Sequence, residues 1–376
     1  MRALLLALGT LAAGFPTSVI AQAAAEPTEY LAKLQSEGDR NRVLNQMEIG
    51  TRYFWAERDD LSAAAFNDAI EKIETVFKQD PGATKARSLW YEEGSKSFKG
   101  EPYERAMVYY YRGLGYLRAG DYENARAAFR QGLMQDAFAE ELQDQADFAL
   151  LLYLEAWASH LNGDADLRDE AMKRVKAIRP DVPDIGADHD TLVLVETGTA
   201  PRKLGDGANH SYFVYRRGKG FKENKAELLL GSEPLRLYPI EDVYTQASTR
   251  GGRAIDKILD GKVEFKRTTG SVGSGLAQGA TMFSAMGGGG AAAGAIGAVG
   301  AIASLMSANA KPRADTRQWS SLPDTVHVLT LASAKAGSAP VVVKYYAGEE
   351  PGAREDQPIT FKADPKGKRL GLLRSR

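Results

Sequence analysis

Cysteine is absent from this chain of 376 residues, and histidine occurs only four times. Without cysteine the chain has no disulfide framework, no thiol nucleophile and no residue to carry a lipoprotein acyl chain. The histidines, at 160, 189, 210 and 327, include no pair at the helical spacing of metal ligands. We therefore expect packing alone to hold the fold, and we expect neither a metal nor any other cofactor.

Net charge is also small, at −1, which gives no reason to expect nucleic acid as a partner. Catalytic motifs are missing too. The chain has no Gly-x-Ser-x-Gly elbow, and Gly218-Lys219-Gly220 lacks the other residues of a phosphate-binding loop. Asp188-His189-Asp190 could hold a cation, but it lies in a polar stretch, where we interpret it as solvated. The sequence predicts a protein that is not an enzyme and has no catalytic residues.

The first residues have the three-part layout of an export signal. Met1-Arg2 is followed by the uncharged stretch Ala3–Ala13, and Ala21-Gln22-Ala23 supplies small residues for cleavage. The apolar run is too short to span a bilayer. We expect a signal peptide at residues 1–23 and a periplasmic protein, peripherally associated with the outer membrane.

Residues 26–180 are predicted to be a helical domain, because apolar residues recur at spacings of three and four. The clearest unit resembles the tetratricopeptide repeat, in which small residues let two helices approach and aromatic residues fill the gaps. Its matching positions are Tyr109, Gly113, Tyr116, Gly120, Tyr122, Ala125, Phe129 and Gly132. Two weaker copies flank it, with turns at Glu57–Asp60 and at Gly163-Asp164, and Pro180 ends the last one.

Stacked hairpins of this kind offer a concave face to a partner protein. Tyr110 and Tyr111 lie off the repeat positions, and Arg105 and Arg112 could pair with an acidic partner. We predict that these four residues line a partner-binding groove. The alternatives are core packing for the tyrosines and solvation for the arginines.

After a predicted linker at 181–190, the pattern changes to β-branched and aromatic runs typical of strands. We expect a β-rich domain at 191–376, built as a small β-sandwich or an open sheet. The predicted strands are 191–196, 211–215, 227–237, 263–266, 324–331, 341–346, 359–362 and 370–373. From Lys362 onward, six lysines and arginines stand against a single aspartate. This indicates a solvated basic tail or attraction to an anionic lipid or polymer.

A glycine-rich insertion at 268–310 contains no charged residue. Two helical arms are expected there, with small residues at helical spacing for close contact with a membrane or with another copy. These residues are Gly275, Gly279, Gly290, Gly294, Gly297 and Ala301. Three alternatives remain open for residues 271–308: a hairpin that enters a membrane or oligomerises there, a hairpin packed on the β-rich domain, or a flexible linker.

Several motifs together resemble a family of poorly characterised bacterial envelope proteins with tetratricopeptide-like N-terminal halves. They are Phe98-Lys-Gly-Glu-Pro-Tyr-Glu-Arg105, the repeat around Gly120-Asp121-Tyr122, the glycine-rich segment, and Ala314-Asp-Thr-Arg-Gln-Trp319 followed by Leu322-Pro323. The resemblance covers about residues 40–335 and implies an envelope role rather than a reaction. We interpret Asp315, Arg317 and Trp319 as structural, with a carboxylate–guanidinium pair and an indole that closes the entry into the next strand.

The predicted fold is therefore α+β: a tetratricopeptide-like helical repeat domain followed by a β-rich domain that carries a glycine-rich helical hairpin. The predicted function is that of an exported envelope scaffold that binds partner proteins through its repeats and meets a membrane, or a second copy, through the hairpin. The alternative is a subunit of an oligomeric outer-membrane transport or secretion assembly.

Overall fold

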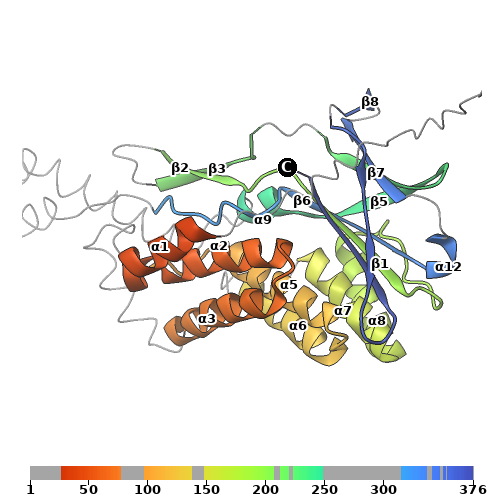
Figure 1. Cartoon of the computed structure of the whole chain (residues 1–376), viewed down its shortest axis with the longest axis horizontal. Helices are drawn as coiled ribbons and strands as arrows, with labels where there is room; N and C mark the ends of the chain where they lie inside the picture. The colour runs from red at the N-terminus through yellow and green to blue at the C-terminus, as the bar shows by residue number, and fades with distance from the viewer. Residues whose placement is uncertain are drawn as a thin grey trace, which may run out of the picture.

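The computed structural model describes residues 27–77, 97–137, 148–206, 212–219, 223–248, 315–336, 341–347, 350–352 and 354–375. Over these residues the protein is α+β, as predicted, with helices in the N-terminal half and a mixed sheet in the C-terminal half (Figure 1). The predicted signal peptide and the predicted hairpin at 268–310, with its six small residues, lie outside the described residues. None of the helices described is both long enough and apolar enough to cross a membrane.

The helices follow one another in closely packed pairs. They are α1 (Thr28–Glu37), a short 3-10 turn (Gly38–Arg40), α2 (Arg42–Trp55), α3 (Asp59–Phe77), α5 (Pro102–Arg118), α6 (Tyr122–Ala137), α7 (Ala149–Asn162) and α8 (Ala165–Ile178). The turns of the pairs α2–α3, α5–α6 and α7–α8 each contain a residue with positive φ: Glu57 at 58°, Gly120 at 70° and Gly163 at 84°. Glycine reaches this conformation without strain, and Glu57 adopts it where the sequence offers no glycine.

Two glycines allow close approach within a pair. A Cβ atom at Gly113 would lie 2.3 Å from Phe129 Cε1, and one at Gly50 would lie 2.7 Å from Phe66 Cε1. Real Cβ atoms do not come this close to a ring carbon. In each pair, therefore, the aromatic ring of the second helix lies directly on the backbone of the first helix.

The C-terminal half forms one sheet and one separate ribbon. The sheet strands are β1 (Thr191–Thr197), β4 (Lys225–Leu230), β5 (Glu233–Asp242), β6 (Thr325–Leu331), β7 (Val341–Ala347), β8 (Glu350–Pro351), β9 (Gln357–Pro358), β10 (Phe361–Ala363) and β11 (Arg369–Ser375). Their order is β10-β11-β1-β6-β5-β4-β7-β8, with β9 also on β7. Among the described strands of this sheet, β1 and β11 alone pair in parallel. The ribbon consists of β2 (Arg202–Asp206) and β3 (Tyr212–Arg216), and α9 (Val243–Ser248) and α12 (Ser333–Ala336) are short helices.

Two expectations about the strands were wrong. Residues 227–237 are not one strand but the hairpin β4–β5, which turns at Gly231, where φ is 63°. Apart from the β2–β3 ribbon, the strands form a single sheet rather than a β-sandwich, and the two ends of this sheet are connected, so it is not an open sheet either. The single segment 357–363 pairs with β7 through β9 and with β11 through β10, so it joins strands from both ends of the sheet. Strand pairing between distant segments is not encoded in local periodicity, which is why the sequence did not predict this closure.

Both faces of the central strand β1 are covered by the protein itself. Leu192 and Leu194 belong to the core shared with the helices, whereas Val193 and Val195 belong to a second core on the opposite face. The alternation follows from the pleat of a strand, in which successive side chains point to opposite faces. A strand buried on both faces reads as a continuous apolar run, as Thr191–Glu196 does.

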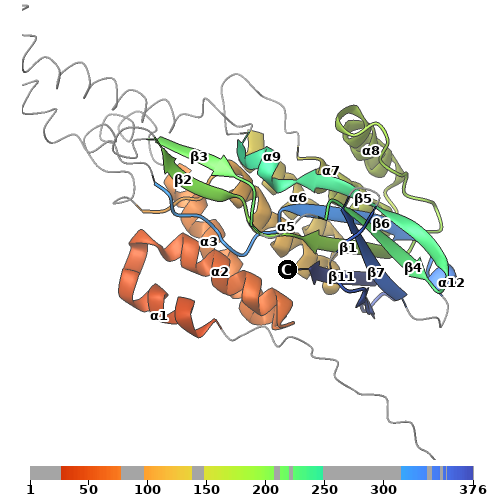
Figure 2. The ribbon, with the colours of Figure 1, turned by 90° about the horizontal axis from the view of Figure 1, so that it is seen from above.

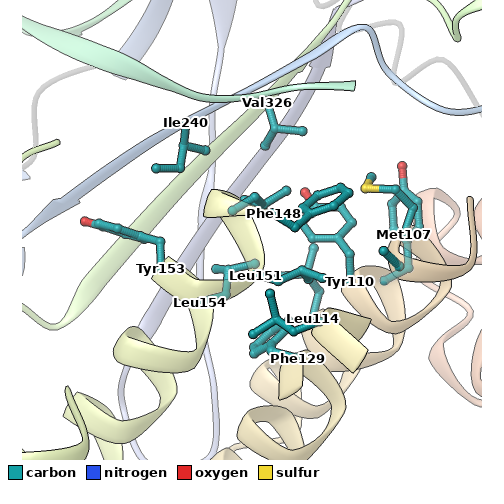
Figure 3. Packing of buried hydrophobic residues seen from close by; sticks show 14 of the residues in the cluster. Met107, Tyr110, Leu114, Phe129, Phe148, Leu151, Tyr153, Leu154, Ile240 and Val326 are labelled. Carbon is teal, nitrogen blue, oxygen red and sulfur yellow. The ribbon is translucent and has the colours of Figure 1, made fainter. Parts of the chain in front are cut away.

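The helices and the sheet share one hydrophobic core (Figure 3). Met107, Tyr110 and Leu114 of α5 are buried in the same cluster as Phe148, at the start of α7, and Val326 of β6. Residues 181–190, the predicted linker, contribute Val182 and Ile185 to this cluster. The sheet lies across the helices in both views (Figures 1 and 2).

Candidate functional site

The predicted partner-binding groove is filled by the protein's own sheet, so the prediction for Arg105, Tyr110 and Tyr111 was wrong. Tyr110 and Tyr111 are fully buried, and the Tyr111 hydroxyl donates a hydrogen bond of 2.9 Å to Glu196 Oε2 on β1. Arg105 is buried too, and its guanidinium donates to the Gly100 carbonyl at 2.8 Å and to Gln135 Oε1 at 3.2 Å.

Arg112 is the one half-buried member of the predicted set. Its Nε donates to Asn67 Oδ1 at 2.8 Å, and its guanidinium lies 3.7 Å from the centre of the Tyr116 ring. It therefore joins neighbouring helices rather than facing a groove. Tyr111 meets Phe54 and Phe66 of the preceding helical pair, at ring-centre distances of 5.2 and 5.8 Å, as well as Glu196 of β1, so it packs between helices and a strand rather than facing a groove.

The segment Asp315–Asp324 also covers the helices. The Trp319 indole is fully buried, with its ring centre 5.8 Å from that of Tyr111 and 6.1 Å from that of Phe66. The predicted pair within this segment is confirmed: the Arg317 guanidinium lies 2.6 Å from an Asp315 carboxylate oxygen. Arg317 also donates to Asn41 Oδ1 at 2.6 Å, which fastens the segment to the start of α2.

Two buried carboxyl groups hold this segment on the helices. Glu48 of α2 accepts hydrogen bonds from the Ser320 backbone N–H at 2.7 Å and from the hydroxyls of Ser320 and Ser321. Glu104 of α5 accepts the Trp319 backbone N–H at 2.6 Å and the Glu101 backbone N–H at 2.7 Å. Burial raises the pKa of Glu104 to about 7, against the opposing charge of Lys203 and these two backbone donors. Trp319 and Ser320 lie more than two hundred residues from these glutamates along the chain, so no local sequence pattern predicts the contacts.

An open cleft lies elsewhere, where the ends of the helices meet the C-terminal strands. Its volume is about 520 Å³, which is within the usual size of ligand sites. The lining comes from the α2–α3 turn, the ends of α5 and α7, and residues 358–372. It consists of Glu57, Asp59, Leu117, Arg118, Trp157, Leu161, Pro358, Thr360, Lys362, Ala363, Asp364, Lys368, Arg369, Leu370 and Leu372. We refer to this site as the junction cleft.

The junction cleft has an apolar floor and a charged rim. Its apolar lining residues are Leu117, Trp157 and Leu161 of the helices with Leu370 and Leu372 of β11. Leu117 and Trp157 are buried, so Leu161, Leu370 and Leu372 form the accessible part of the floor. Even-numbered residues of β11 lie on the helix side of the sheet, because Leu370 and Leu372 pack against the shared core, whereas Leu373 packs against the second core. The floor is thus the part of the helix–sheet boundary that the two layers leave unfilled.

Most charges on the rim are already paired. The Arg118 guanidinium lies 2.7 Å from an Asp59 oxygen, and Lys362 forms an ion pair with Glu57. Asp364 accepts a hydrogen bond of 2.6 Å from the Tyr122 hydroxyl. The basic C-terminal stretch is therefore not a solvated tail. It forms β10 and β11. Lys362, Lys368 and Arg369 line the cleft, and Arg374 forms a buried pair with Glu196 at 3.4 Å, whereas Lys366 is exposed.

The histidines do not form a site with the cleft. His327 on β6 is buried, with Nε2 3.1 Å from Thr197 Oγ1, and burial lowers its pKa to about 4, so that it stays neutral. His189 Nδ1 accepts the Gly186 N–H at 3.1 Å and lies 2.9 Å from Thr330 Oγ1, while Asp190 bonds Ser333. Within the residues that the structure describes, no group of three or more acidic or histidine side chains could hold a metal ion. His210 lies outside those residues.

Comparison with protein-family models and with curated proteins finds no match. Function must therefore be argued from the junction cleft and from the sequence.

Proposed function

We propose that this protein is an exported scaffold of the bacterial envelope that binds a partner protein through the junction cleft. The observation that carries the proposal is the contrast between two surfaces. The inner face of the helical pairs is filled by Trp319 and the sheet, whereas the junction cleft is open, with an apolar floor and charged groups at its rim. Binding sites commonly combine an apolar surface with a few polar groups that fix orientation.

The helical half fits the tetratricopeptide-like assignment in several respects. It has three successive pairs of helices, each with a left-handed residue in its turn. Gly113 and Phe129, and likewise Gly50 and Phe66, occupy the positions where the repeat needs a small residue against an aromatic one. Such repeats commonly serve as binding scaffolds. The layout of residues 1–23 supports export, and the resemblance to envelope proteins supports a periplasmic location peripheral to the outer membrane.

A site-specific crosslink in living cells tests the proposal. A photoreactive amino acid replaces Thr360, which is exposed and lines the cleft, and a control replaces Glu233, which is exposed on the β4–β5 turn. We expect an adduct of one defined mass from position 360, none from position 233, and recovery of the adduct in the envelope fraction. Equal labelling from both positions, or an adduct only with cytosolic proteins, would contradict the proposal.

The alternative, a subunit of an oligomeric outer-membrane transport or secretion assembly, rests on the uncharged small-residue pattern of residues 271–308. Fractionation with a carbonate wash distinguishes it from the scaffold. If the wild type stays with membranes and a variant without residues 271–308 becomes soluble and monomeric, the assembly is favoured. If both are soluble and both give the position-360 crosslink, the scaffold is favoured.

A further inference from the structure

The rim of the junction cleft carries more positive than negative charge. Asp59 is paired with Arg118 and Glu57 with Lys362, whereas Asp364 accepts a hydrogen bond from the Tyr122 hydroxyl and keeps its charge. Four cations therefore stand against three carboxylates in the lining. Lys368 and Arg369 also line the cleft, and neither forms a salt bridge within the described part of the chain. Two half-buried cations thus remain for a ligand.

The turn before β11 fixes the backbone that carries these two cations. Asp364 Oδ1 accepts the backbone N–H groups of Lys366 at 2.8 Å and Lys368 at 2.9 Å, while Gly367 takes the left-handed conformation at φ 80°. The Arg369 N–H donates to the Asp190 carbonyl at 2.9 Å. A site whose charged groups are held in place before binding loses less entropy when the ligand arrives.

A competing intramolecular partner for Lys368 is already occupied. The charge of Lys368 helps to lower the pKa of Asp190, after burial and the hydrogen bonds to that carboxylate are counted. Both oxygens of Asp190 accept hydrogen bonds, from the Ser333 backbone N–H and hydroxyl at 2.6 Å and from the Thr191 hydroxyl at 3.0 Å. Lys368 thus attracts Asp190 but forms no salt bridge with it, so its ammonium group can also meet a carboxylate of a ligand.

The strand beside the cleft favours a peptide over other anions. Phe361–Ala363, the strand β10, stands at the end of the strand order and pairs with β11 on one side only. Among the described strands none pairs with its other edge, and Lys362 and Ala363 of this strand line the cleft. An extended peptide can add to such an edge through its backbone while its side chains enter an adjacent pocket.

We infer that the junction cleft binds an acidic peptide segment, with a carboxylate held by Lys368 and Arg369 and a neighbouring apolar side chain on the half-buried Leu161, Leu370 and Leu372. This inference rests on the proposed partner-binding function and names the chemistry of the partner segment. The carboxylate supplies the charge that the rim lacks, and the apolar side chain covers the floor that the helix–sheet boundary leaves open.

Selection from a random peptide library, with acidic, basic and neutral residues equally frequent, tests the inference on the full chain. Selected peptides are then titrated against the wild type and three variants. The double variant Lys368→Glu with Arg369→Glu reverses the two free charges. Thr360→Trp blocks the cleft, and Lys366→Glu is the matched control, being an exposed residue of the same turn outside the lining. If the charge reversal alters the melting temperature, the double variant Lys368→Gln with Arg369→Gln replaces it in the titration.

We expect the wild type to select peptides rich in aspartate and glutamate next to an apolar residue. Charge reversal should weaken their binding by roughly tenfold or more, because like charges then face each other. Lys366→Glu should change binding by no more than about twofold, since the charge is exposed and outside the cleft. Binding to the wild type should also weaken as salt is added.

Two other outcomes separate the inference from the function on which it rests. If peptides bind, Thr360→Trp abolishes binding, and neither acidic enrichment nor an effect of charge reversal is seen, then the inference is wrong and the cleft remains a peptide site of another chemistry. If no selected peptide depends on the cleft, both the inference and the proposed use of the cleft are overturned.

Discussion

Two fully buried ionisable groups, Glu104 and His327, should make opposite contributions to the pH dependence of stability. The pKa of Glu104 is about 7 in the folded protein against an ordinary 4.5, and that of His327 is about 4 against 6.5. Burial is the principal cause of both changes, because each group is less well solvated when charged. Each difference corresponds to about 3 kcal/mol of folding free energy.

The sign differs between the two groups. Between pH 4.5 and 7 the folded protein keeps the proton of Glu104 while the unfolded chain has lost it, so stability falls as the pH rises. Between pH 4 and 6.5 the unfolded chain protonates the histidine while the folded protein keeps it neutral, so stability rises with pH. Over the shared range the two contributions largely cancel in the wild type.

A variant that lacks one of the two groups should therefore show the pH dependence of stability that cancels in the wild type. Urea unfolding at a series of pH values gives the stability of Glu104→Gln and of His327→Gln relative to the wild type, so that contributions from other carboxylates cancel. Relative to the wild type, Glu104→Gln should gain about 3 kcal/mol as the pH rises through the window of the glutamate. His327→Gln should lose a similar amount as the pH rises through the window of the histidine. A difference from the wild type that does not vary with pH would refute the reasoning for that residue.

Two further predictions concern packing. Gly113→Ala places a Cβ atom 2.3 Å from the Phe129 ring and should lower the free energy of unfolding by about 1–3 kcal/mol. In the same helix, the Cβ atom added by Gly115→Ala would meet only the end of the Arg112 side chain, at 3.7 Å, so this variant should raise the free energy of unfolding by up to about 1 kcal/mol. Equal effects of the two variants in chemical denaturation would contradict the close approach of Gly113 to Phe129. Trp319→Ala should cost about 3–5 kcal/mol in the same assay because its indole is fully buried, and a loss under about 1 kcal/mol would show that the segment does not seal the helices.

Local patterns predicted the elements better than they predicted their assembly. The turns at Gly120 and Gly163, the strand at 191–196 and the pair Asp315–Arg317 follow from residue type and short spacing, and the structure has them. The hairpin within 227–237 was missed because Gly231 was read as part of a strand, although glycine there marks a turn.

The candidate site was harder to predict, because each of its sides comes from a distant part of the chain. The burial of Tyr110 and Tyr111 was not predicted, because periodicity carries no information about which later strand covers a helix surface. The one available signal for the junction cleft was the excess of lysine and arginine after residue 361. Whether this excess indicates a tail or a binding site depends on which of these charges form ion pairs, and only the tertiary structure shows that.

The parallel pairing of β1 with β11 has a consequence for the order in which the protein is made. Synthesis proceeds from the N-terminus, so the helices and β1 emerge long before residues 369–375, which pair with residues 191–197. Until then one edge of β1 has no partner, and pairings over such sequence distances form slowly. Between the synthesis of β1 and that of β11 this edge can pair with other chains. Shielding by a chaperone until the last strand emerges would protect it from aggregation.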